Sequence, residues 1–133
     1  MIISNLKELD LSNIPIVIIG SGPSAITLAL ELEKKKIDCL IIEAGGEKYD
    51  YESQQSYKAE VVGNKVSNLT HSRLRQFGGT SGHWGGWCKP LEDYNFSNWN
   101  IGKKDLDKYS NKACEILGIK NQFRNVKLSS YFE

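Results

Sequence analysis

The residues best placed to do chemistry are a short glycine-rich turn, Gly20–Ala25 (GSGPSA), and a single acid, Glu43. Glycines in such a turn let the backbone approach a pyrophosphate, whose charge is stabilised by the N–H groups that begin the following helix. Glu43 follows Gly20 by roughly twenty residues, the spacing at which a carboxylate binds ribose hydroxyls. The pattern predicts a site for the ADP half of a dinucleotide.

The segments around this turn predict how it is held. The apolar run Ile16–Ile19 is typical of a buried parallel strand, and Pro23 suits the first turn of a helix because its missing N–H has no partner there. A second apolar run, Ile37–Ile42, ends at Glu43. Residues 1–13 form a lead-in, and residues 14–46 are predicted to fold as strand, helix and strand. Since one helix cannot cover both faces of a sheet, we expect apolar side chains such as Ile41, Ile42 and Trp87 to stay exposed.

A second glycine-rich stretch, Gly78–Gly86, has glycine at five of its nine positions. Glycine costs backbone entropy inside a regular helix or strand, so we expect a loop. Arg73 and Arg75 alternate on the segment before it, and Trp84 lies within it. The composition predicts a loop whose backbone passes close to a flat or charged ligand.

The overall composition limits the classes of function. The 133 residues suffice for one modest domain, and 17 basic residues nearly balance 16 acidic ones, which gives no indication of a nucleic-acid partner or an anionic membrane surface. The three cysteines, Cys39, Cys88 and Cys114, are odd in number and far apart. They predict reduced thiols rather than a disulfide framework or a metal site. Without an apolar run of membrane-spanning length, the sequence predicts a cytoplasmic protein with no membrane segment.

The final third predicts a loop and one helix. The loop 91–100 is expected to be anchored by three aromatic residues, Tyr94, Phe96 and Trp99. The helix is predicted over 103–117, with Gly102 as its N-cap, Asp105 placed to bind that cap, and Gly118 ending it.

With these residues in view, the chain resembles the amino-terminal part of a glucose–methanol–choline (GMC) flavoprotein oxidoreductase. The first stretch is Ile16–Gly46, with its Glu-Ala-Gly ending at Glu43. The second, Arg73–Gly86, is similar to the family's second flavin loop, except that Phe77 replaces a leucine. The third is Trp99–Tyr109, in which Asn100 replaces the family's proline.

The resemblance implies an α/β fold: a Rossmann-like βαβ FAD-binding unit of a GMC-type flavoprotein, truncated before its substrate domain. Residues 14–133 would form a partial FAD-binding domain with its βαβ unit at 14–46, its flavin loop at 71–90 and its helix at 103–117. The implied cofactor is FAD, and the implied reaction is hydride transfer from a CH–OH group of an alcohol or sugar to the flavin. The residues expected to bind FAD are Gly20, Ser21, Gly22, Pro23, Ser24, Ala25, Glu43, Ala44, Arg75, Gly78, Gly79, Thr80, Ser81, His83, Trp84 and Gly85.

No catalytic residue is assigned in this chain, because the family's proton-accepting histidine lies near the end of a much longer sequence. The chain alone is therefore expected to be an inactive cofactor-binding fragment. Two alternatives remain open: an NAD(P)-dependent dehydrogenase, which would use the same Ile16–Glu43 unit, and a non-catalytic nucleotide-binding remnant. The stretch Gly78–Gly86 disfavours the dehydrogenase, which has no need of it.

His83 lies in a segment, Gly79–Trp84, that looks like the run in which pyranose oxidases carry flavin covalently on a histidine. Gly82 departs from that pattern, which has threonine there. A neutral imidazole nitrogen held against the dimethylbenzene edge of a flavin can attack its 8α carbon. His83 is accordingly a candidate for covalent attachment of FAD.

Overall fold

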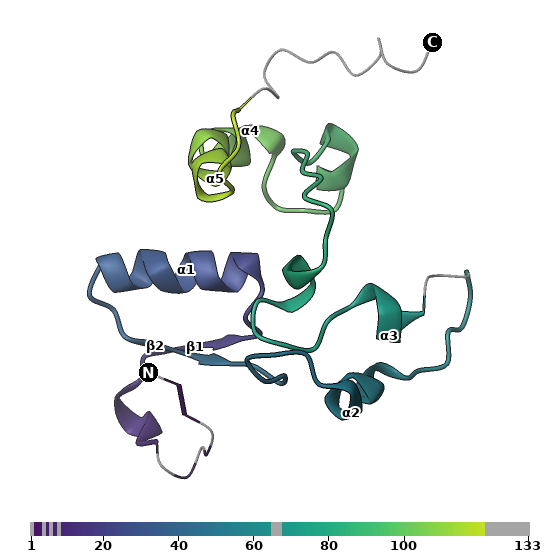
Figure 1. The fold of residues 1–133 in the computed structure, drawn as a ribbon. Helices are drawn as coiled ribbons and strands as arrows, with labels where there is room; N and C mark the ends of the chain where they lie inside the picture. Colours follow the sequence, from purple (N-terminus) through teal and green to yellow (C-terminus); the bar gives the residue numbers. More distant parts are fainter. Residues whose placement is uncertain (1, 4, 6, 8, 65–67, 122–133) are drawn as a thin grey trace. The chain divides into compact units, whose positions relative to one another are not determined.

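The computed structural model describes residues 2, 3, 5, 7, 9–64 and 68–121 (Figure 1). The chain divides into two compact units, Met1–Gly85 and Gly86–Glu133, each of which is described by itself.

The first unit is built on a βαβ arrangement. Strand β1 (Ile16–Ile19) leads into helix α1 (Pro23–Lys34), and the chain returns in strand β2 (Cys39–Ile42), parallel to β1. The register pairs Ile16 with Cys39 and Ile19 with Ile42, so both strands end at the same edge. The mixed helix-and-strand class predicted from the sequence is confirmed, as are the first strand and the place of Pro23 at the start of α1.

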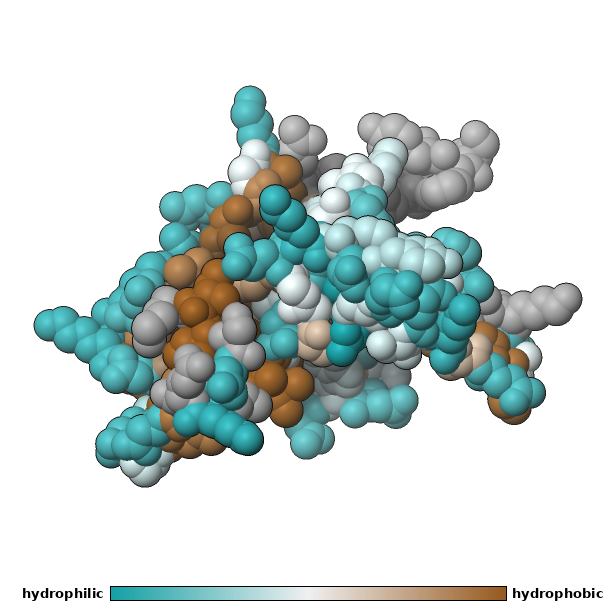
Figure 2. Space-filling model, turned by 60° about the horizontal axis from the view of Figure 1, so that its bottom comes forward, coloured by the Kyte–Doolittle hydropathy of each residue, from teal (hydrophilic) through white to brown (hydrophobic). Residues whose placement is uncertain are grey.

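Among the described helices, α1 packs against this sheet and leaves part of it exposed. Helix α1 packs on one side, where Ile18 is buried, whereas on the other side Ile19 is 87% exposed and Val17 is 51% exposed. Figure 2, in which the bottom of the view in Figure 1 comes forward, shows a band of apolar side chains. The expected exposure of Ile42 and Trp87 is confirmed, at 38% and 93%, while Ile41 is half-buried.

Short turns of helix fill the rest of the first unit. They are the 3-10 helix η2 (Leu11–Asn13), helix α2 (Tyr51–Gln54), the 3-10 helix η3 (Gln55–Tyr57), helix α3 (Leu69–Ser72) and the 3-10 helix η4 (Gly79–Gly82). The Asn68 side chain accepts a hydrogen bond from the Thr70 N–H and caps the start of α3, and the chain becomes extended at Arg73. The glycine loop, expected to be irregular, forms one 3-10 turn in η4.

The second unit contains the 3-10 helix η5 (Asp93–Phe96) and two short helices, α4 (Lys103–Asp107) and α5 (Ser110–Ile116). The prediction of one continuous helix over 103–117 is therefore wrong, because two helices occupy this range. The Ser110 hydroxyl donates to the carbonyl of Asp107 at 2.7 Å and competes for the backbone acceptor there. The predicted ends are confirmed: Asp105 accepts from the Gly102 N–H at 2.8 Å, and Gly118 has a left-handed φ of 68°.

The aromatic anchors of this unit are two rather than three. Phe96 is buried and meets Trp99 edge-to-face, with ring centroids 5.7 Å apart. Tyr94 is 70% exposed, so its predicted anchoring role is wrong. Tyr94 and Phe96 are two positions apart in a helix of three residues per turn, so their side chains point in different directions and only Phe96 is buried.

Candidate functional site

The glycine turn between β1 and α1 is shaped by its backbone. Gly20 has a φ of 89°, which an L side chain rarely adopts, and its N–H donates to the Ile42 carbonyl at 2.8 Å. Gly22 is the N-cap of α1, and its carbonyl accepts from the Ile26 N–H at 3.0 Å. Ser24 and Ala25 lie in the first helical turn, where backbone N–H groups have no acceptor within the helix. The turn thus directs a helix N-terminus toward the edge where both strands end.

Ser21 and Glu43 form a polar cluster beneath this turn. Ser21 is completely buried, and both its N–H and its hydroxyl donate to Glu43 Oε2, at 2.9 and 2.6 Å. The Gly45 N–H donates to Glu43 Oε1 at 2.8 Å. Burial raises the pKa of Glu43, but the hydrogen bonds from Ser21, Gly45 and Ala44 outweigh it, so the pKa lies below its ordinary value. Glu43 is therefore a carboxylate at neutral pH and ties the turn to the end of β2.

The second glycine-rich stretch meets the first at this cluster. The Gly78 N–H donates to the Ser21 hydroxyl oxygen at 3.0 Å, across 57 positions of sequence. The Phe77 N–H donates to the Gly46 carbonyl at 2.8 Å, next to a parallel bridge between Gly46 and Gln76. Ser21 is thus one of the links between the two motifs that the sequence predicts to bind a cofactor.

Close backbone packing reinforces this junction. A Cβ at Gly45 would overlap the backbone of Arg75, so the two chain segments approach each other there as only glycine permits. Gly78 and Gly79 both have left-handed φ values, 84° and 61°, which turn the chain into η4. A Cβ at Gly79 would lie 3.9 Å from the Gly22 Cα, so the two glycine turns are neighbours in space.

A cavity of about 370 Å³ opens at this junction. Several predicted cofactor residues line it: Gly20, Ser21, Gly22, Glu43, Ala44, Gly79 and Thr80. The others lie outside its lining: Pro23, Ser24, Ala25, Arg75, Gly78, Ser81, His83, Trp84 and Gly85. Arg75 binds the Ser53 hydroxyl, and the side chains of His83 and Trp84 are exposed. The structure therefore brings seven of the predicted residues together around one cavity, whereas the other nine do not line it.

Four lining residues were not predicted from the sequence: Ile19, Ile42, Tyr57 and Leu74. The two isoleucines are the last residues of their strands, so their place at this edge follows from the register once the parallel pairing is known. Tyr57 lies in a polar stretch without periodicity, where the sequence carries no signal for a site residue.

The buried side chain of Gln54 explains how Tyr57 reaches the cavity. The Gln54 Nε2 donates to the carbonyls of Thr70 and Arg73, at 2.9 and 2.5 Å, and its Oε1 accepts from the Arg75 N–H at 3.0 Å. One side chain thus fastens α2 and η3 to the segment that carries Leu74. This arrangement sets Tyr57 and Leu74 at the same cavity.

The glycines of the first turn indicate what the cavity can accommodate. A Cβ at Gly20 or Gly22 would meet nothing within 4 Å, and Gly22 has an ordinary φ of −66°. Neither backbone conformation nor packing among the described residues requires glycine at position 22. Room beside its backbone, a helix N-terminus and an ionised carboxylate form a cradle that fits the pyrophosphate and ribose of a dinucleotide.

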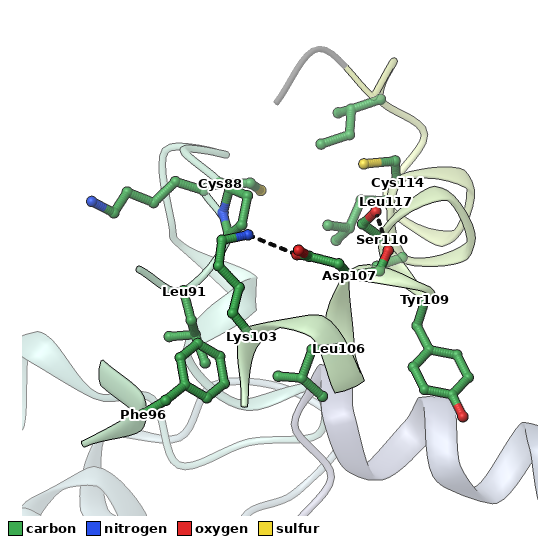
Figure 3. A pocket seen from close by; sticks show the side chains of 14 residues that line it. Cys88, Leu91, Phe96, Lys103, Leu106, Asp107, Tyr109, Ser110, Cys114 and Leu117 are labelled. Carbon is green, nitrogen blue, oxygen red and sulfur yellow. Dashed lines mark hydrogen bonds and ion pairs between the residues drawn. The ribbon is translucent and has the colours of Figure 1, made fainter. Parts of the chain in front are cut away.

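A second cavity, of about 310 Å³, lies within the unit Gly86–Glu133 (Figure 3). Apolar side chains of η5, α4 and α5 dominate its lining, together with Cys88 and Cys114. Its lining lysines are ion-paired: Lys103 Nζ lies 2.7 Å from Asp107 Oδ1, and Lys89 pairs with Glu92. The hydrogen bond to Asp107 raises the pKa of Lys103. With its charges already paired, this cavity does not offer the groups that would orient a polar cofactor.

Two further properties of the described residues bear on function. Among residues 2, 3, 5, 7, 9–64 and 68–121, no cluster of three or more histidine, cysteine or acidic side chains is placed to hold a metal ion. No helix in the same part of the chain is long and apolar enough to cross a membrane.

Comparison with known proteins adds no family to this geometry. No protein-family model, curated protein or solved structure matches the chain.

Proposed function

We propose that the cavity beside Gly20, Gly22 and Glu43 binds the ADP half of FAD. The observation that carries this proposal is the empty space beside Gly22, a position where neither the backbone nor neighbouring side chains call for glycine. A ligand that lies against the backbone of Gly22, and so leaves no room for a Cβ, explains why glycine stands there. The pyrophosphate then lies at the N-terminus of α1, where unpaired N–H groups and the positive end of the helix dipole stabilise its charge.

The Glu43 carboxylate accepts a hydrogen bond from the adenosine ribose. Three hydrogen-bond donors of the chain, the Ser21 N–H, the Ser21 hydroxyl and the Gly45 N–H, already bind its two oxygens. A carboxylate accepts about four hydrogen bonds, so it retains capacity for a ribose hydroxyl. The low pKa of Glu43 keeps it in the accepting, ionised form.

Gly79 and Thr80, from the second glycine stretch, line the same cavity and contact the same ligand. A nucleotide bound by two separate glycine motifs supports FAD over a nicotinamide cofactor, which the βαβ unit alone would satisfy. When bound, FAD supplies the acceptor for a hydride removed from a CH–OH group. On this proposal the chain is the cofactor-binding part of a GMC-type oxidoreductase that acts on an alcohol or sugar.

The test is titration of the purified chain with FAD, ADP and NAD, read by calorimetry. We expect FAD and ADP to bind, and the variant Gly22→Ala to weaken both by at least about tenfold, because its methyl group occupies the space of the pyrophosphate.

A matched control exists in the second unit. Gly102 is also an N-cap glycine with extended backbone, at the start of α4. Gly102→Ala incurs the same local cost of losing a glycine N-cap and should leave ligand affinity unchanged. Undiminished affinity in Gly22→Ala, or a wild-type chain that binds neither FAD nor ADP, contradicts the proposal.

A further inference from the structure

Tyr57 lies in the nucleotide cavity although nothing in its sequence context indicates a site. Its side chain is half-buried and lines the cavity together with Glu43, Ala44 and Leu74. Within the described part of the chain its hydroxyl makes no hydrogen bond, so the ring is not held there by a polar contact of its own.

The position of Tyr57 is fixed from behind. Tyr57 ends η3, and Gln54, which caps the start of that turn, is only 1% exposed and is bonded through both ends of its amide. The Lys58 N–H closes the turn by donating to the Gln55 carbonyl at 3.0 Å. The aromatic ring is therefore presented to the cavity by a braced turn rather than by a free loop.

The lining of the cavity changes character from one part to another. The glycine turn and Glu43 provide backbone N–H groups and a carboxylate, which suit a pyrophosphate and a ribose. Ile19, Ile42 and Leu74 provide apolar surface, and Ile19 is 87% exposed. A flat heteroaromatic ring is the part of a nucleotide that apolar side chains and a phenol ring would bind.

We propose that the Tyr57 ring contacts the adenine ring of the nucleotide bound in this cavity. This inference rests on the proposed function and extends it from the phosphate and ribose to the base. The Glu43 carboxylate then binds the ribose of the adenosine, and the aromatic ring of Tyr57 binds its base. The phenol hydroxyl has no part in this contact.

The experiment measures the affinities of ADP and FAD by calorimetry for four forms of the full chain. Tyr57→Leu should weaken ADP and FAD by the same factor, about tenfold, because both ligands carry the adenine and lose one stacking contact. Tyr57→Phe should bind both like the wild type. Tyr51→Leu is the matched control, since Tyr51 lies six residues earlier, at the start of α2, and is 64% exposed outside the cavity.

A second measurement is made on the wild-type chain and therefore needs no substitution that could destabilise the fold. On addition of ADP to the wild-type chain, the ring-proton NMR signals of Tyr57, assigned by their loss in Tyr57→Phe, should move upfield under the ring current of adenine. The Tyr51 signals should not move.

The outcomes separate this inference from the proposed function. If the wild type binds ADP but its Tyr57 signals stay in place and Tyr57→Leu binds ADP normally, the inference fails and the proposed function stands. A loss of FAD affinity without a loss of ADP affinity places Tyr57 against the flavin and also overturns the inference. Failure of the wild type to bind either ligand overturns both.

Discussion

The Glu43 carboxylate allows a quantitative test of how the two glycine motifs are held together. In Glu43→Gln one oxygen can still accept from Ser21 or Gly45, but the amide NH₂ must face the other donor. At least one charge-assisted hydrogen bond is lost, which costs about 2 kcal/mol. Because each 1.4 kcal/mol is tenfold, amide hydrogen exchange at Gly45 and Gly78 should lose protection by about 30-fold.

The pH dependence of the same protection checks the sign of the argument. The pKa of Glu43 is lowered in the folded state, so its stabilising contribution is present above the ordinary carboxyl value, about 4.3. That contribution disappears as the pH falls through the lower folded-state value. The difference between wild type and Glu43→Gln should therefore be large near neutral pH and vanish in acid.

Exchange measured residue by residue by NMR is the suitable assay, because it reports on the junction alone. Glu47→Gln is the matched control: it removes an exposed carboxylate close by in sequence and should leave the protection of Gly45 and Gly78 unchanged. Equal protection in wild type and Glu43→Gln on both sides of the carboxyl titration would refute the reasoning.

Two further changes probe the same unit. Gly45→Ala should lower the free energy of unfolding, measured in urea, by about 1–3 kcal/mol, because its Cβ would overlap the backbone of Arg75. Gly46→Ala is the control, since its Cβ has room and should have a much smaller effect. Equal unfolding midpoints for the two variants would contradict this. If His83 carries flavin covalently, acid precipitation of the FAD-loaded protein should leave yellow colour in the pellet of the wild type and of His71→Ala but not of His83→Ala. Complete release of flavin from the wild type would make His83 at most a contact residue.

Local patterns predict the central part of this fold well. The run Ile16–Ile19, the proline at the helix start and the return at Ile42 each carry their own signal, and the spacing from Gly20 to Glu43 follows from their lengths. Local signals fail where neighbouring side chains compete with the backbone. Ser110, for example, interrupts the helix predicted over 103–117 by binding a carbonyl within it.

The contact between the turn Gly20–Ala25 and the stretch Gly78–Gly86 could not be predicted from the sequence of either motif. It includes a hydrogen bond from the Gly78 N–H to a hydroxyl 57 positions earlier, and a serine in a glycine turn predicts no particular distant partner. Tyr57 was missed for a related reason. Its position follows from the Gln54 amide, which bonds Thr70 and Arg73 across a stretch without hydrophobic periodicity.

These contacts show what holds the site together in the first unit. Its two fully buried side chains are polar, Ser21 and Gln54, and each joins segments that are far apart in sequence, whereas Ile18 is its only buried apolar side chain among the described residues. A hydrogen bond fixes direction as well as distance, while apolar packing on a two-stranded sheet would let the loops slide. The position of the cavity walls therefore depends on a few directed bonds, of which those to Glu43 require its ionised form. The geometry that would bind a nucleotide and the stability of the unit thus rest on the same side chains, so substitutions at Ser21 or Glu43 should change both together. Substitutions at Gly22 or Tyr57 should instead change nucleotide affinity and leave the stability of the unit unchanged.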